Sequence, residues 1–78
     1  MKRDLLIKFR GQRSQSDMAE IYGVSQQAWS KWENGMSLPK IATMKQIELD
    51  SGVPMEYFFS DAFTTLSFNQ LKPIHSRK

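Results

Sequence analysis

Apolar residues recur three or four positions apart along most of the first sixty residues, which is the spacing of amphipathic helices. Short segments with glycine or proline interrupt this pattern and mark the ends of successive helices. The pattern predicts helices over residues 4–10, 15–22, 25–33, 40–51 and 54–59. The side chains expected to be buried are Leu6, Ile7, Phe9, Met18, Ala19, Ile21, Tyr22, Ala28, Trp29, Trp32, Ile41, Met44 and Ile47.

The second and third expected helices begin and end at residues suited to capping. The Ser14 hydroxyl can accept a hydrogen bond from the backbone N–H three residues on, where Asp17 also suits the positive end of the helix dipole. Gly23 supplies a left-handed stop that a β-carbon would penalise, and Ser25 caps the next helix. Two short helices around a glycine turn are therefore expected within residues 15–35.

Residues 60–78 do not continue the helical pattern. Residues 63–68, FTTLSF, are rich in aromatic and β-favouring side chains, and the last seven residues have the composition of a frayed, solvated end. We therefore divide the chain into a helical domain, residues 1–59, and a carboxyl-terminal extension, residues 60–78.

The aromatic residues near this boundary suggest self-association. Phe63, Leu66 and Phe68 are too apolar to be left in water if their segment is ordered. A short strand or arm that pairs with a second copy of the chain would bury them, whereas a tail folded back near Ser51 of the fourth helix would bury them within one chain. The dimer contacts expected are Tyr57, Phe58, Phe63, Leu66 and Phe68.

Composition excludes several classes of protein. The 78 residues are enough for one small domain, and the absence of cysteine excludes disulfides and thiolate metal sites. No apolar run approaches the roughly 18 residues of a membrane span, and the first residues lack the apolar core of a signal peptide, so a cytoplasmic protein is expected. His75 is the only histidine, so neither a metal site, a cofactor nor a catalytic set is expected, and the chain is not predicted to be an enzyme.

The basic residues are concentrated at the two ends of the chain. Residues 1–13 hold five basic residues against one acidic residue, and residues 72–78 add three basic residues, whereas the middle is acidic. Basic ends suit contacts with phosphates. The alternative is ordinary solvated charge that keeps the protein soluble.

The expected helix 25–33 has two distinct sides. Ala28, Trp29 and Trp32 fall in one arc, which indicates that both tryptophans pack in the core rather than stack on bases. The opposite arc holds Gln26, Gln27, Ser30, Lys31 and Glu33, and of these Glu33 is interpreted as a structural hydrogen-bond or ion-pair partner. A glutamine amide can pair with both groups that adenine presents in the major groove, so this arc indicates a sequence-specific DNA binder. The alternative is that glutamine is only a good helix former on a solvated surface.

A spaced set of residues continues this pattern along the chain: Gln15, Ala19, Gly23, Val24, Ser25, Trp29, Trp32, Glu33, Asn34, Gly35, Pro39, Gly52 and Val53. The set resembles the Cro/repressor-type (Xre-like) helix-turn-helix family of bacterial and phage regulators, over about residues 5–59. The resemblance implies a compact all-α bundle of five helices, in which residues 25–33 form the recognition helix in the major groove. Trp29 stands where the family usually has a β-branched aliphatic residue, so packing there is expected to differ.

The resemblance also implies which residues meet DNA. Base contacts are expected from Ser25, Gln26, Gln27, Ser30 and Lys31. Phosphate contacts are expected from Gln15 at the start of its helix, from Asn34 and Lys40 beside the following loop, and from Arg10 and Arg13 in the basic amino-terminal segment.

These expectations amount to a transcriptional regulator that binds double-stranded DNA. A homodimer on a palindromic operator would double the readout of a single helix, and a repressor of phage, prophage or antitoxin type fits this description. The alternative is a protein-interaction module that uses the same bundle together with its aromatic segment, residues 57–68.

Overall fold

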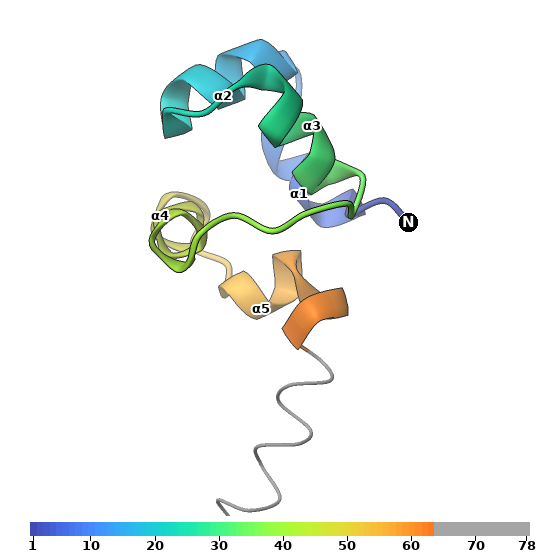
Figure 1. Ribbon diagram of the computed structural model, residues 1–78. Helices are drawn as coiled ribbons and strands as arrows, with labels where there is room; N and C mark the ends of the chain where they lie inside the picture. Colours follow the sequence, from blue (N-terminus) through green and yellow to red (C-terminus); the bar gives the residue numbers. More distant parts are fainter. Residues whose placement is uncertain (64–78) are drawn as a thin grey trace, which may run out of the picture.

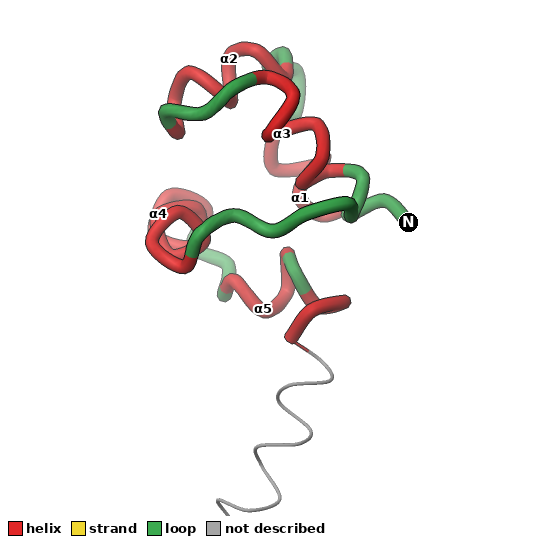
Figure 2. The backbone as a smooth tube through the Cα atoms, viewed as in Figure 1, coloured by secondary structure: helices red, strands yellow, loops and turns green. Residues whose placement is uncertain are grey.

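The computed structural model describes residues 1–63, in which helices joined by turns and loops are the regular secondary structure and no strand occurs (Figures 1 and 2). The helices are α1 (Asp4–Arg10), α2 (Gln15–Tyr22), α3 (Gln26–Glu33), α4 (Ile41–Ser51) and α5 (Met55–Phe58), and residues 60–63 add a further helical turn. The predicted all-α fold is confirmed. Each helix lies within one residue of its predicted bounds at both ends.

The helices around the central turn begin and end as their capping residues predict. The Ser14 hydroxyl accepts from the Asp17 N–H at 2.9 Å, and the Asp17 carboxylate accepts from the Ser14 N–H at 3.3 Å. Ser25 caps α3 in the same way, through a 3.0 Å hydrogen bond from the Ala28 N–H. Gly23 ends α2 in the left-handed conformation with φ of 68°, so the turn between α2 and α3 is set by local interactions.

Three helices surround one side of the core and two close the other. α2 packs against α3, α1 lies against both α3 and α5, and α4 packs against α5 (Figure 1). An extended segment connects α3 to α4 and passes between these two groups of helices (Figure 2). The buried apolar core consists of Leu6, Met18, Ala19, Trp29, Trp32, Met44, Ile47, Phe58 and Phe59.

Trp29 is the largest fully buried side chain and joins α2 to α3. Its ring stacks on Tyr22 with centroids 5.6 Å apart and meets Trp32 edge-on at 5.5 Å. Such aromatic pairs stabilise a core beyond the apolar area that they bury. The Trp29 indole is therefore the centre of an aromatic cluster with Tyr22 and Trp32.

Two isoleucines expected in the core are exposed. Ile21 is 54 % exposed because it lies about 110° around α2 from the centre of the arc that holds Met18, Ala19 and Tyr22. Ile41 is exposed because it is the first residue of α4, and side chains lean toward the amino-terminal end of their helix, here away from the bundle.

The predicted boundary at residue 59 lies inside the folded unit. Residues 60–63 form a helical turn rather than the start of a strand, since the N–H groups of Ala62 and Phe63 both donate to the Phe59 carbonyl. The Arg3 guanidinium pairs with Asp61 at 2.9 Å, and Phe63 packs against the core. The folded domain therefore extends at least to residue 63, and Leu66 and Phe68 lie outside the described residues.

The capping box at Ser14 gives a prediction about stability. The Ser14→Ala protein loses the oxygen that accepts from Asp17, so its free energy of unfolding is expected to fall by about 1 kcal/mol in urea titrations followed by tryptophan fluorescence. The matched control is Ser16→Ala, which changes an exposed serine inside the same helix and is expected to have little effect. Equal losses in the two proteins would contradict the capping role of Ser14.

Candidate nucleic-acid interface

The turn between α2 and α3 presents one side of α3 to solvent. The Val24 N–H donates to the Ala19 carbonyl at 2.9 Å and the Gly23 N–H donates to Glu20 at 3.2 Å, which closes the end of α2. Trp29 and Trp32 hold the inner side of α3 in the core. The opposite side of α3 therefore has a fixed orientation relative to α2.

The outer side of α3 forms an open, shallow hollow with the start of α2. The hollow is lined by Gln15, Gln26, Gln27, Ser30 and Lys31, hereafter the polar face. Gln26, Gln27 and Lys31 are exposed, and within residues 1–63 their side chains have no hydrogen-bond partner. Two amides and an ammonium group on one surface are therefore available to a ligand.

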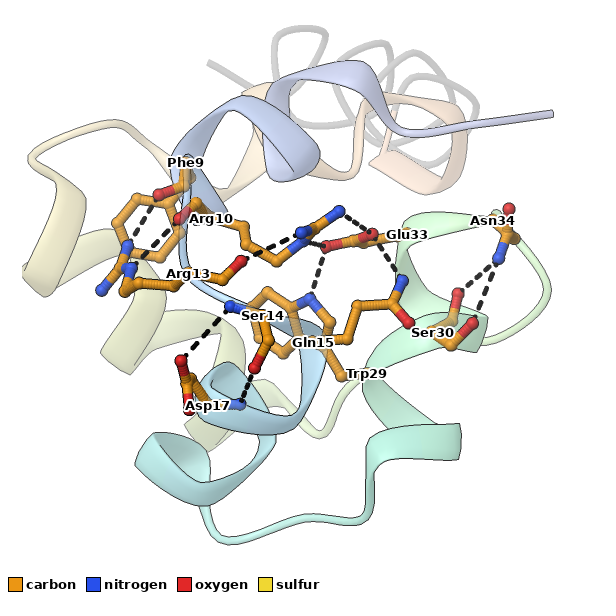
Figure 3. A network of polar contacts seen from close by, with 10 residues as sticks. All are labelled: Phe9, Arg10, Arg13, Ser14, Gln15, Asp17, Trp29, Ser30, Glu33 and Asn34. Carbon is orange, nitrogen blue, oxygen red and sulfur yellow. Dashed lines mark hydrogen bonds and ion pairs between the residues drawn. The ribbon is translucent and has the colours of Figure 1, made fainter.

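The buried carboxylate of Glu33 lies beside Gln15, one of the residues of the polar face (Figure 3). Oε2 accepts from Arg10 Nε and from the Trp29 indole N–H, each at 2.6 Å, and Oε1 accepts from the Gln15 amide at 2.9 Å. Although it was placed in the polar arc of α3, Glu33 is only 2 % exposed. Its interpretation as a structural hydrogen-bond and ion-pair partner is confirmed.

The network around Glu33 determines its ionisation. Burial alone would raise the pKa of the Glu33 carboxyl, but hydrogen bonds from Arg10, Gln15 and Trp29, with the charge of Arg10, hold the pKa below its usual value. Glu33 therefore stays ionised at neutral pH and ties α1, α2 and α3 together.

Two residues expected to contact phosphates are part of this network. The Arg10 guanidinium makes two hydrogen bonds to Glu33 and also donates to the Arg13 carbonyl at 3.0 Å. Arg10 thus has a structural role, because its guanidinium donates to groups within the protein. Gln15 gives one amide hydrogen to Glu33 and also lines the hollow, so it connects the buried network to the polar face (Figure 3).

The side chains of Arg13 and Asn34 also make internal contacts. The Arg13 guanidinium donates to the carbonyls of Phe9 and Arg10, and it lies 5.3 Å from the centre of the Phe9 ring. Arg13 nevertheless remains exposed at the surface. The Asn34 amide donates to the Ser30 carbonyl at 2.8 Å and closes the last turn of α3.

Comparison with protein-family models gives a match over residues 6–58, to the helix-turn-helix model HTH_3. The chain belongs to the Xre/Cro-like helix-turn-helix family. Comparison with curated proteins and with solved structures finds no match. Membership identifies the protein as a DNA-binding transcription regulator, in which α2 and α3 are the helix-turn-helix pair.

The other expected contact residues of this helix-turn-helix protein differ in exposure. Lys40 precedes α4 and is exposed, with no side-chain hydrogen bond within residues 1–63. Tyr57 is 65 % exposed, whereas Phe58 is only 3 % exposed and belongs to the core. Phe58 therefore has almost no surface to offer a second copy of the chain, which corrects its expected place in a dimer interface. Phe63 is partly buried against the core.

Sequence reasoning gave no role to Arg3 beyond its charge. Arg3 is 5 % exposed, and its side chain donates to Asp61, which lies 58 residues away in the sequence, and to two backbone carbonyls. A single arginine ahead of a helix carries no local signal for such contacts. The structural role of Arg3 becomes apparent only from its contact with Asp61, which is distant in the sequence.

The described part of the chain offers neither a metal-binding cluster nor a membrane-spanning helix. Residues 1–63 contain no group of three or more His, Cys, Asp or Glu side chains placed to hold a metal ion. Among these residues, no helix has the length and apolar character needed to cross a membrane.

The Glu33 network gives a prediction about acid stability. Because the pKa of Glu33 is lowered by folding, its stabilisation is complete above the unfolded pKa of about 4.3 and is lost as pH falls through the lower folded value. The Glu33→Gln protein is expected to be less stable at pH 7 by about 2 kcal/mol, and to lose less further stability than the wild type between about pH 5 and pH 3.

Urea unfolding at several pH values measures this difference. Asp61, whose pKa is lowered by its hydrogen bonds with Arg3, contributes to acid destabilisation in both proteins. Glu20→Gln, at an exposed position of α2, is the control and should keep the wild-type pH profile. Parallel profiles for the wild type and Glu33→Gln would contradict the role given to this carboxylate.

Proposed function

We propose that this protein is a transcriptional repressor that binds a specific double-stranded DNA sequence and reads the major groove with α3. The observation that supports the proposal best is the polar face, where Gln26, Gln27 and Lys31 are exposed and have no partner within residues 1–63. Exposed amides on a helix fixed by its neighbours suit base recognition, because hydrogen bonds to base edges require defined geometry.

Base contacts are proposed for Ser25, Gln26, Gln27, Ser30 and Lys31. A glutamine amide matches the donor and acceptor of adenine, and lysine suits the acceptors of guanine. The hydroxyl oxygens of Ser25 and Ser30 already accept from Ala28 and Asn34, which leaves each serine its hydroxyl hydrogen and one further lone pair for a base. Gln26, Gln27 and Lys31 are therefore the principal readers in this proposal.

Phosphate contacts are proposed chiefly for Lys40, Arg13, Gln15 and Asn34. Lys40 is the simplest case, because its ammonium group is exposed. Gln15 keeps a second amide hydrogen beyond the one given to Glu33. Arg10 would act mainly through Glu33, since its guanidinium is occupied there.

A homodimer on a palindromic operator completes the proposal. One eight-residue helix spans only a few base pairs, so two copies on one face of the duplex would double the contacts. Tyr57, which is exposed, and Phe63, Leu66 and Phe68 are the proposed dimer contacts. Phage or prophage repressors and antitoxins that repress their own operons both fit, acting on the bacterial nucleoid in the cytoplasm.

The alternative of a protein-interaction module gains no support from the aromatic residues of the described chain. Phe58 and Phe59 are core residues and Phe63 is partly buried, which leaves Tyr57 as the exposed aromatic side chain between residues 57 and 63. In vitro selection from a random duplex library tests the main proposal directly. Enrichment of one motif supports it, a symmetric motif supports two copies, and no enrichment would reject sequence-specific binding.

The Gln27→Ala protein tests base reading. Loss of one bidentate amide contact is expected to weaken binding to the selected sequence by about 1–3 kcal/mol and to relax preference at one base pair, measured by electrophoretic shift with single-base variants. Gln46→Ala, on α4 and outside the polar face, is the matched control and should bind as the wild type does. Unchanged specific binding by a folded Gln27→Ala protein would contradict the assignment.

The Lys40→Gln protein tests phosphate contact. Its affinity is expected to fall for all DNA sequences alike, and the slope of log affinity against log salt concentration should decrease by about one unit, because one phosphate contact is removed. Lys45→Gln removes the same charge from an exposed position of α4 and is expected to leave the slope unchanged. A loss confined to one DNA sequence would rule out a phosphate role for Lys40.

A further inference from the structure

Arg3 occupies an unusual position for a charged residue outside the helices. Its guanidinium lies 5.2 Å from the centre of the Phe59 ring, and it makes two hydrogen bonds with the Asp61 carboxylate, both 2.9 Å long. A buried arginine is stable only when its donors are satisfied. Here Asp61 and two backbone carbonyls fulfil that requirement.

The carbonyls that Arg3 contacts lie at the carboxyl-terminal end of α3 and in the segment that follows it. Nη1 donates to the Trp32 carbonyl at 2.6 Å and to the Ser37 carbonyl at 2.8 Å, and the backbone N–H of Arg3 donates to the Glu33 carbonyl at 2.7 Å. The last carbonyls of a helix lack a full set of partners within the helix. Arg3 therefore acts as a cap for α3 that is supplied from the amino-terminal segment.

The backbone next to Arg3 also lies close to the chain that follows α3. Met1 passes so close to Gly35 that a β-carbon at Gly35 would overlap the Met1 carbonyl oxygen. Gly35 also has a φ of 73°, which side-chain-bearing residues rarely adopt. The amino-terminal segment is thus packed directly on the chain that leaves α3.

We infer that Arg3 is a positioning residue for DNA recognition, which fixes the carboxyl-terminal end of α3 to the amino-terminal segment and to the helical turn 60–63. The inference rests on the proposed function, since it makes Arg3 and Asp61 determinants of sequence preference that do not touch DNA. The start of α3 is set by Gly23 and Ser25, and Arg3 sets its other end.

This position matters because base contacts depend steeply on distance and angle. A small tilt of α3 would shift Gln26, Gln27 and Lys31 together relative to the base edges. The planar guanidinium of Arg3 reaches Asp61 with Nε and Nη2 and two backbone carbonyls with Nη1. Lysine cannot replace Arg3 in this role, because its single ammonium group lacks this planar set of donors.

Two variants test the inference, with controls matched in charge. Asp61→Asn weakens the pair at the surface, and Arg3→Lys keeps the charge but loses the fork. The control for Asp61 is Glu56→Gln, at an exposed position of α5, and the control for Arg3 is Lys2→Gln, at its exposed neighbour. Circular dichroism and urea unfolding show which variants fold. If Arg3→Lys does not fold, the inference is tested with the Asp61→Asn protein alone.

Both variants are expected to bind the selected DNA sequence about tenfold more weakly than the wild type does, a loss comparable to that of one base contact. The salt slope and the affinity for random DNA are expected to be unchanged. Amide hydrogen exchange is expected to accelerate at Asn34 and Met36, whose N–H groups close the end of α3. Glu56→Gln should show neither effect, and Lys2→Gln should not lower the preference for the selected sequence.

Several outcomes would overturn the inference. Full wild-type specificity in Arg3→Lys would show that only the charge matters. Tighter binding of all sequences by Asp61→Asn would show that Asp61 acts as a negative charge near DNA. If the wild type selects no sequence, the proposed function fails, and the exchange rates at Asn34 and Met36 still decide whether Arg3 holds the end of α3.

Discussion

The structure depends on one buried carboxylate. Glu33 lies out of contact with water, and an ionised group there would be very costly without partners. Arg10 from α1, Gln15 from α2 and Trp29 from α3 together satisfy its two oxygens. Because each donor comes from a different helix, the requirement to satisfy Glu33 fixes how the first three helices are arranged.

The same requirement explains how the basic residues are divided. Arg3, Arg10 and Arg13 each donate to groups of the protein itself, whereas Lys31 and Lys40 are exposed. The planar guanidinium has five donors and suits several fixed hydrogen bonds at once, whereas the strongly hydrated ammonium of lysine, on its flexible stem, stays at the surface more readily. Counting positive charges in the amino-terminal segment therefore overstates what that segment offers to DNA.

α3 both packs in the core and presents a polar surface within eight residues. Its inner side places Trp29 and Trp32 in the aromatic core, and its outer side presents the polar face. Gln15 touches both Glu33 and the hollow, so the packing of the first three helices and the shape of the polar face are linked. A change in the buried network is thus also a change in the surface that would meet DNA.

The sequence by itself determined the helices, their caps and the polar side of α3, because periodicity, capping and glycine turns are interactions between neighbours in the chain. Ser14, Gly23 and Ser25 act as their local context predicts. Only the tertiary structure decided that Glu33 is buried and that Arg3 reaches Asp61. These outcomes depend on which segments distant in sequence meet when the helices pack, and helical spacing carries no information about such meetings.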